Sequence, residues 1–402
     1  MFKSLSLKVI IFGFIFTFFS SFGQSFFLGL FNSSIRETLS ITHGQFGSIY
    51  ASATLLSSLI LVWIGKKIDD VNIFKFALYV TFFLSLSCFL FSKIFSITFL
   101  FFGIFFMRLA GQGLSTHTAT TTISRYFNKN RGRALSFGWL GLSAAEFSLP
   151  VLIIFLLSIM NWRDIWSSIS LLVIVILPIL SYFLVKEISL SSREEIDKTN
   201  KVSEKFKQWR RSEVLRDYRF YIICLNMFCM PWISTGTFVY QSFISSSKSW
   251  GPYVMAQSFM AYSILSVITL FLSGFLIDKF TSRRLLLYMN IPILIAVIIL
   301  FLFESFISAF VILGLYGISN GLTNLLGSST WAEIYGVQYI GSIKALSTAI
   351  MVFSTAFGTA LFGFLIDIGF TIQDISVIAM ILIIIPLVML FSIKNKLNPT
   401  YI

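Results

Sequence analysis

Two residues of opposite charge stand inside long apolar segments of this chain. Arg108 and Glu146 flank a short basic turn at residues 128–133, and each is 19 residues from Phe127. In an antiparallel helix pair, equal chain lengths mean equal depth, and about 20 apolar residues cross a bilayer. A charge near the bilayer midplane costs at least about 3 kcal/mol, so such residues are candidate functional groups that usually have a partner.

The two charges allow competing interpretations. The planar guanidinium of Arg108 could bind a substrate carboxylate. It could instead pair with Glu146, either tuning proton binding there or forming a purely structural contact. A carboxyl group in a low-dielectric environment favours its neutral form unless a cation lies nearby, which makes Glu146 a candidate proton carrier. A permanent pair would be neutral overall and would argue against anion capture.

Uncharged polar side chains in the apolar segments are further candidates for contact with a solute. Residues four apart share a helix face, and polar groups in hydrocarbon face the bundle interior or a wet cavity. Interhelical hydrogen bonding is an equally good explanation. His117 is nine residues from Arg108, on the opposite helix face, so we expect it to pack against another helix. Four candidates spaced four residues apart form one polar stripe along the tenth span: Tyr316, Asn320, Asn324 and Ser328. The other candidates are Gln24, Gln112, Asn226, Tyr240 and Gln241.

The composition is that of an integral membrane protein. Of 402 residues, 56% are hydrophobic and only 12% charged, against about 25% charged in soluble domains. The net charge of +13 comes from basic residues between apolar segments, so we expect contacts with lipid headgroups and not with nucleic acid. The sequence has no phosphate-binding loop, no hydrolase triad and no metal-ligand spacing of its three cysteines. It therefore predicts neither an enzyme nor a cofactor.

Hydropathy predicts an all-α membrane protein with twelve transmembrane helices. The positive-inside rule places both termini in the cytoplasm, since Lys and Arg concentrate in the even-numbered turns. The first span follows Lys8 without a cleavage site and is predicted to be one uncleaved helix. The spans are 8–31, 46–64, 73–92, 96–120, 134–158, 164–185, 219–243, 253–275, 285–303, 306–328, 343–366 and 372–393.

The two halves of the chain repeat each other. The turn after the second span holds Gly65 and Asp69, and the turn after the eighth holds Gly274 and Asp278, an offset of 209 residues. We therefore expect a six-helix half at 1–185, a cytoplasmic linker at 186–218 and a second six-helix half at 219–402. Such pseudo-symmetric halves are typical of a transporter with its site between them.

These motifs resemble those of the major facilitator superfamily. The segment 274–284, which ends in Arg283 and Arg284, is similar to the superfamily's cytoplasmic gate motif G-x-L-x-D-r-x-G-r-r. The corresponding turn of the first half departs from this motif at Asp70 and Asn72. Arg108 with the segment 111–113 resembles the R-x-x-x-G motif of the fourth helix. The resemblance implies that helices 1, 4, 7 and 10 line the central cavity. The phrases RYFNKNRGRALSF and AEIYGVQYIGSIKAL are most similar to the oxalate/formate and monocarboxylate carrier branch.

The resulting expectation is a monomeric secondary transporter of the cytoplasmic (inner) membrane. It would carry a small organic anion by alternating access, coupled to protons. Arg108 would be the cation that binds the anion or takes part in coupling, and Glu146 would be the group that gains and loses the proton. The alternative is a carrier of a larger or neutral solute such as a vitamin, or an exporter of amphipathic compounds, with Trp139 and Trp232 lining the cavity. A third possibility is a sensor on a carrier fold, which would bind solute without moving it.

Overall fold

The chain is helical through nearly all of the part described by the computed structural model, which covers residues 4–69, 71–127, 131–186, 188, 207–336 and 338–398. It divides into two compact units, Met1–Asn200 and Lys201–Ile402. Their boundary falls inside the predicted linker. Most of that linker, residues 189–206, lies outside the described residues, so the three-part division stays a prediction.

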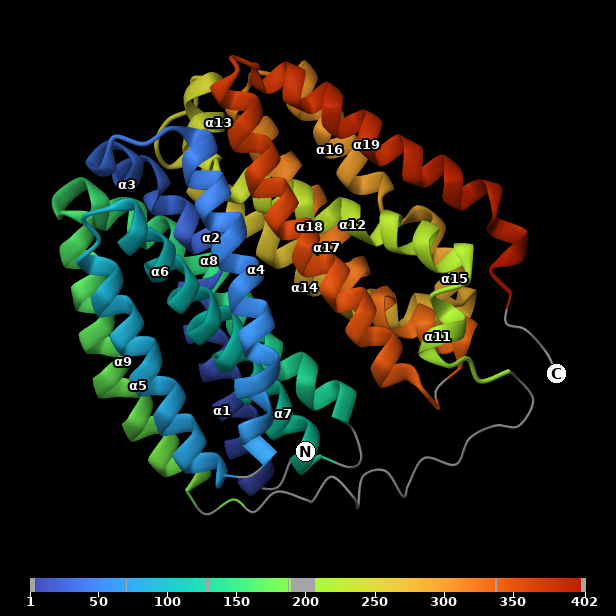
Figure 1. The fold of residues 1–402 in the computed structure, drawn as a ribbon, viewed down its shortest axis with the longest axis horizontal. Coiled ribbons are helices and arrows are strands. Elements are labelled where there is room, and N and C mark those ends of the chain that lie inside the picture. The colour runs from blue at the N-terminus through green and yellow to red at the C-terminus, as the bar shows by residue number, and fades with distance from the viewer. Residues whose placement is uncertain are drawn as a thin grey trace. The chain divides into compact units, whose positions relative to one another are not determined.

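The described residues of unit 1 form six membrane spans and nine α-helices. Helix α5 lies beside α9, and α1 lies beside α8 (Figure 1). The helices are α1 (Ser4–Ser20), α2 (Ser25–Leu28), α3 (Asn32–Leu39), α4 (His43–Gly65), α5 (Ile73–Ser92), α6 (Ile97–Met107), α7 (Thr116–Tyr126), α8 (Arg131–Ile159) and α9 (Trp162–Val185).

Unit 2 contains the other six spans, with α14 beside α17 and α12 beside α18 (Figure 1). A short helix of the predicted linker, α11, precedes them. The helices are α11 (Arg211–Val214), α12 (Tyr218–Val239), α13 (Gln241–Ser247), α14 (Val254–Phe280), α15 (Ser282–Leu285), α16 (Ile291–Leu302), α17 (Phe306–Tyr335), α18 (Ile340–Asp367) and α19 (Ile372–Ser392).

Twelve helical segments of the described residues are long and apolar enough to cross a membrane, which confirms the predicted fold class. Most boundaries agree within four residues. The fourth and tenth spans continue to Tyr126 and Tyr335, beyond the predicted ends at 120 and 328, because their last turns are too polar for a hydropathy window to include. Helix α12 continues through Pro231 and Gly236 to Val239, although Pro231 has no backbone N–H and therefore leaves one position of the hydrogen-bond ladder empty.

Local sequence determines where several helices begin. Thr42 and Gln45 form a capping box at the start of α4, and Thr371 and Asp374 form one at the start of α19. Each box satisfies backbone N–H groups that have no partner inside the helix. The capping boxes therefore define the first residues of α4 and α19.

Glycines allow close contact between helices within each unit. A Cβ added at Gly141 of α8 would overlap the carbonyl oxygen of Phe14 in α1. In unit 2, a Cβ at Gly317 of α17 would overlap the carbonyl oxygen of Tyr262 in α14. Helices in a bilayer associate through such van der Waals contact, since lipid is as apolar as the side chains. Small residues therefore explain why these pairs are neighbours.

The first span is not the single helix that we predicted for 8–31. Helix α1 ends at Ser20, a 3₁₀ turn η1 (Ser21–Gly23) follows, and Gln24 is extended at φ −84° and ψ 153°. Helix α2 then restarts the span. The break occurs where the backbone of this span lies against the backbone of the fourth span, and a hydropathy pattern contains no signal for such a contact.

Candidate functional site

The fourth span carries Arg108 at the start of a widened stretch of helix. Between α6 and α7, the segment η4 (Arg108–Ser115) has π-helical hydrogen bonding. The hydroxyl of Ser115 donates to the carbonyl oxygen of Ala110, five residues earlier, at 2.8 Å. Short π-helical stretches inside α-helices are frequent at functional sites.

The π-helical stretch faces the break in the first span. A Cβ at Gly23 would overlap the carbonyl oxygen of Met107, and a Cβ at Gly111 would lie 2.6 Å from the amide nitrogen of Gly23. No side chain fits between these backbones, so both positions require glycine. Two irregular backbone segments thus meet inside the membrane-spanning region of unit 1, where such segments are tolerated only against protein or a wet cavity.

Arg108 crosses this contact and binds the first span. Its Nη1 donates to the carbonyl oxygen of Gly23 at 3.1 Å and to the hydroxyl of Ser25 at 3.3 Å. Its guanidinium carbon lies 5.4 Å from the ring centroid of Tyr50 on α4, whose hydroxyl donates to Ser25 at 3.0 Å. All of these partners are neutral, so the positive charge of Arg108 is not compensated by them.

The guanidinium of Arg108 keeps unused hydrogen-bonding capacity. The residue is 3% exposed, and its Nε is buried without a hydrogen-bond partner among the described residues. An unsatisfied buried donor costs about 1–3 kcal/mol, and more when it is charged. A buried polar group without a partner is unusual in folded proteins and calls for an explanation, such as a functional role or a bound water.

Glu146 lies on α8, in the middle of the fifth span. It is 8% exposed, and no described residue forms a hydrogen bond or ion pair with it. In particular, no nitrogen of Arg108 lies within 4 Å of its carboxylate oxygens. The Arg108–Glu146 pair that we considered is therefore not formed in this structure. These two are the only buried charged residues among the described part of unit 1.

The predicted amides of unit 1 occupy the same region of the backbone. Gln24 directly follows Gly23, and Gln112 directly follows Gly111. Both side chains are partly buried, and neither has a hydrogen-bond partner among the described residues. The break in the first span and the π-helical stretch of the fourth therefore each place one side-chain amide next to the backbone contact between Gly23 and Gly111.

In unit 2, two members of the polar stripe bind neighbouring helices. The hydroxyl of Tyr316 lies 3.2 Å from the hydroxyl of Thr237 on α12, and the amide of Asn320 donates to the hydroxyl of Ser266 on α14 at 2.9 Å. Asn324 differs from both. It is exposed and makes no hydrogen bond with any described residue, and the side chain of Ser328 lies outside the described part.

The candidates on α12 and at the start of α13 also form hydrogen bonds with protein groups. The hydroxyl of Tyr240 donates to the carbonyl oxygen of Thr359 on α18 at 3.0 Å. The amide nitrogen of Gln241 donates to the carbonyl oxygen of Phe238 at 2.9 Å. Asn226 donates to the carbonyl oxygen of Pro386 and accepts from Asn290, both at or below 2.7 Å. These polar groups join helices within unit 2.

The structure describes the contacts of some residues of the predicted cytoplasmic gate motifs but not of all of them. In unit 2, Arg283 pairs with Glu333 of α17 at 2.9 Å and donates to Asn398 at 2.6 Å, while Arg284 is exposed. In unit 1, the carbonyl oxygen of Gly65 lies 3.0 Å from Nε2 of His117, which packs against the end of α4. The side chains of Asp69 and Asp278, and the surroundings of Gly274, lie outside the described part.

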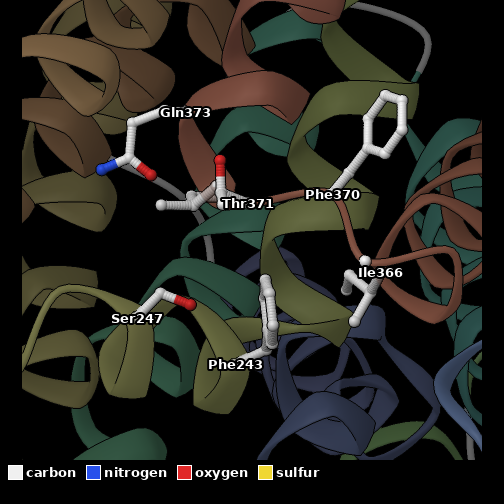
Figure 2. A pocket seen from close by; sticks show the side chains of 8 residues that line it. Phe243, Ser247, Ile366, Phe370, Thr371 and Gln373 are labelled. Carbon is white, nitrogen blue, oxygen red and sulfur yellow. The ribbon is translucent and has the colours of Figure 1, made fainter.

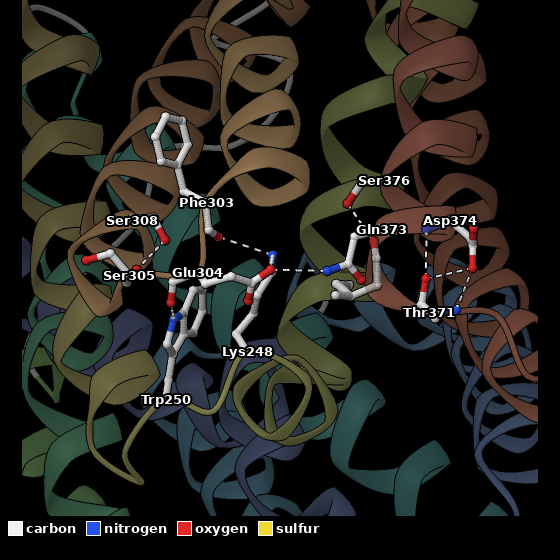
Figure 3. Close-up of polar contacts among 11 residues, drawn as sticks. Lys248, Trp250, Phe303, Glu304, Ser305, Ser308, Thr371, Gln373, Asp374 and Ser376 are labelled. Carbon is white, nitrogen blue, oxygen red and sulfur yellow. Dashed lines mark hydrogen bonds and ion pairs between the residues drawn. The ribbon is translucent and has the colours of Figure 1, made fainter.

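A pocket of about 360 Å³ lies elsewhere, at the end of unit 2 where α18 and α19 meet. Figure 2 shows Phe243, Phe370, Thr371 and Gln373 around it. The amide of Gln373 donates to Glu304, which pairs with the buried Lys248 at 2.9 Å (Figure 3). None of the predicted site residues lines this pocket, so it does not support the predicted solute site.

Tyr50 and Ser25 are contacts of Arg108 that the sequence did not reveal. Ser25 is a small residue next to Gln24, and Tyr50 is one of many aromatic residues in apolar spans. Nothing in the sequence distinguishes Tyr50, because its predicted span 46–64 contains five other hydroxyl side chains. Only the break at Gln24 brings Ser25 to the guanidinium.

Comparisons with known proteins agree with this architecture. Residues 13–359 match the Major Facilitator Superfamily. A search of the curated proteins gave no match. Among solved structures, a bacterial homolog of the human lysosomal transporter Spinster, crystallised in an inward-facing and unoccupied conformation, is similar with a TM-score of 0.71 and 13% identity, over 99% of this chain and 98% of that one. The nucleoside transporter NupG is similar with a TM-score of 0.67 and 15% identity, over 98% and 99%.

The twelve spans and the match over most of the chain define a multi-pass membrane transporter. The chain belongs to the Major Facilitator Superfamily. Its partners include the lipid bilayer and a small-molecule substrate. The similarity to Spinster and NupG, at 13–15% identity, shows the fold alone.

Proposed function

We propose that this transporter carries a small organic anion across the cytoplasmic (inner) membrane by alternating access, coupled to protons. The observation that carries the proposal is the environment of Arg108. A buried cation with only neutral partners and an unpartnered Nε offers charge and donors to an anionic ligand. Arginine is suited to carboxylates because its donors form a planar fork.

The proposed proton carrier is Glu146. It is the one buried carboxylic acid among the described residues of unit 1, and it has no partner there that fixes its protonation state. A membrane carboxyl group that can gain and lose a proton is a common coupling element in transporters. Substrate and proton would then use separate side chains of the same unit.

The remaining parts of the proposal follow from sequence patterns. Both termini are proposed to be cytoplasmic, from the distribution of Lys and Arg. The gate motifs around Gly65, Asp69, Gly274, Asp278, Arg283 and Arg284 are proposed to close the cytoplasmic side. Resemblance to the oxalate/formate and monocarboxylate branch supports a carboxylate substrate, and we propose that the transporter works as a monomer.

Thermal unfolding of the purified protein with a solute panel tests the proposal. A ligand that binds only the folded protein stabilises it by RT ln(1 + [L]/Kd), whatever the transport direction. The panel contains monocarboxylates, dicarboxylates, vitamins, nucleosides and amphipathic cations. We expect a carboxylate to stabilise the parent and not Arg108→Ala. A neutral or cationic ligand that stabilises both proteins equally would instead establish the alternative, a carrier of neutral or amphipathic solutes.

A further inference from the structure

The break in the first span frees one backbone acceptor beside Arg108. In an uninterrupted helix the amide of Phe27 would bind the carbonyl oxygen of Gly23, four residues earlier. Here that amide binds the carbonyl oxygen of Gln24 at 3.2 Å. The carbonyl oxygen of Gly23 is therefore available, and Nη1 of Arg108 donates to it.

Two further groups fix the same end of the guanidinium. The hydroxyl oxygen of Ser25 accepts from Nη1 of Arg108, and it also accepts from the hydroxyl of Tyr50. The ring of Tyr50 lies beside the guanidinium, 5.4 Å from its central carbon. Tyr50 is completely buried and Ser25 is 8% exposed, so solvent does not compete strongly for these contacts. Tyr50 acts on Arg108 both through its ring and through Ser25.

The opposite edge of the guanidinium has no protein partner. A guanidinium can bind two oxygens through the parallel N–H groups of Nε and Nη2. Nε of Arg108 is buried and unpartnered, and Nη2 makes no hydrogen bond with any described residue. The protein thus occupies Nη1 and leaves one complete two-donor edge unused.

We infer that Ser25 and Tyr50 are specificity-determining positioning residues that orient Arg108, so that its Nε–Nη2 edge binds both oxygens of one carboxylate group in the guanidinium plane. The inference rests on the proposed function, because it describes how the same site recognises its anion. A planar group with two oxygens matches this edge. A tetrahedral sulfonate of equal charge matches it less well, since its third oxygen lies outside the plane.

Binding of acetate and of methanesulfonate tests the inference. Both carry one methyl group and one negative charge, so size and charge do not distinguish them. Their dissociation constants are measured by thermal-shift titration at constant ionic strength, on the parent, Ser25→Ala, Tyr50→Phe and Arg108→Lys. Tyr79→Phe is the matched control, because Tyr79 is 65% exposed on α5.

We expect the parent and Tyr79→Phe to prefer acetate by about tenfold, the value of one charge-assisted hydrogen bond. Ser25→Ala and Tyr50→Phe should still bind both anions with little preference, and Arg108→Lys should lose the preference because an ammonium has no fork. An unchanged preference in Ser25→Ala and Tyr50→Phe, or equal binding of the two anions by the parent, would overturn the inference and leave the proposed function standing. Absence of Arg108-dependent binding of either anion would contradict both.

Discussion

Arg108 donates from Nη1 to the carbonyl oxygen of Gly23 at 3.1 Å and does not pair with Glu146. These two buried charged residues of the described part of unit 1 thus form no ion pair with each other. A paired arrangement would be neutral and could hold the helices together without binding anything. Separate charges leave the cation available to an anionic substrate and the carboxyl group available to a proton, and each role can be tested alone.

Glu146→Gln is expected to abolish accumulation of substrate driven by a pH gradient, since glutamine cannot carry a proton. Exchange of substrate across the membrane should continue, because the anion site at Arg108 is intact. The measurement is uptake of labelled substrate into proteoliposomes, with and without a pH gradient. Glu37→Gln serves as the control, because Glu37 is exposed on α3. Full pH-driven accumulation by Glu146→Gln would assign the proton to another group.

Gly23→Ala and Gly111→Ala are expected to destabilise the protein by at least about 1–3 kcal/mol, as overpacking does. A new Cβ at either position meets backbone atoms of the other span, which cannot rotate away. Gly132→Ala is the matched control, since a Cβ at this helical position meets nothing within 4 Å. Thermal unfolding checks the difference. Unfolding temperatures equal to that of Gly132→Ala would show that the two backbones do not meet as described.

Asn320→Ala should affect mainly stability, and Asn324→Ala should affect mainly substrate binding. Asn320 donates to Ser266, so its loss should lower stability by about 1 kcal/mol, the value of one hydrogen bond. Asn324 has no protein partner and is exposed. Its replacement should change stability by less than about 0.5 kcal/mol and weaken substrate binding instead. The checks are thermal unfolding and substrate titration. Equal stability losses would assign both residues to helix packing.

Acidification should loosen α11, which lies outside the membrane spans. The backbone N–H of Arg210 and the ammonium of Lys207 lower the pKa of the Glu213 carboxyl below its ordinary value. A lowered pKa means stabilisation that is present above the unfolded-state pKa of about 4.3 and is lost as the pH falls through the lower folded-state pKa.

Hydrogen exchange of residues 210–214 measures this loosening as the pH is lowered below 5. Glu213→Gln should show low protection relative to the intrinsic exchange rate at every pH, because a neutral amide replaces the carboxylate. Slow, pH-independent protection in the parent would contradict a structural role for the ionised carboxylate.

Most of the architecture could be predicted from the sequence, but only part of the candidate site could. Apolar length and basic turns determine spans directly, so all twelve were placed without knowledge of the packing, although the first is broken at Gln24. Arg108 and Glu146 could be singled out because a charge in hydrocarbon is costly wherever it lies. Their partners could not be predicted, because Ser25 reaches Arg108 only through the break at Gln24.

The polar stripe of α17 shows the same limitation, because the sequence does not give the partners of its residues. Its spacing correctly places Tyr316, Asn320 and Asn324 on one helix. Spacing does not say which neighbouring helix faces each residue, and Thr237 and Ser266 accept or donate only because α12 and α14 lie there. Hydropathy likewise gave no sign of the π-helical stretch at 108–115, because side-chain apolarity does not distinguish π-helical from α-helical backbone hydrogen bonding.

Counterflow of a labelled carboxylate into proteoliposomes tests the central claim most directly. Arg108→Ala is compared with the parent and with Arg163→Ala, whose guanidinium binds the carbonyl oxygen of Ile94 at 2.7 Å and lies at the start of α9. The carboxylate is the one that stabilises the parent in the solute panel. Our account predicts counterflow in the parent and Arg163→Ala and at least about a tenfold lower initial rate in Arg108→Ala. An undiminished rate in Arg108→Ala would contradict it.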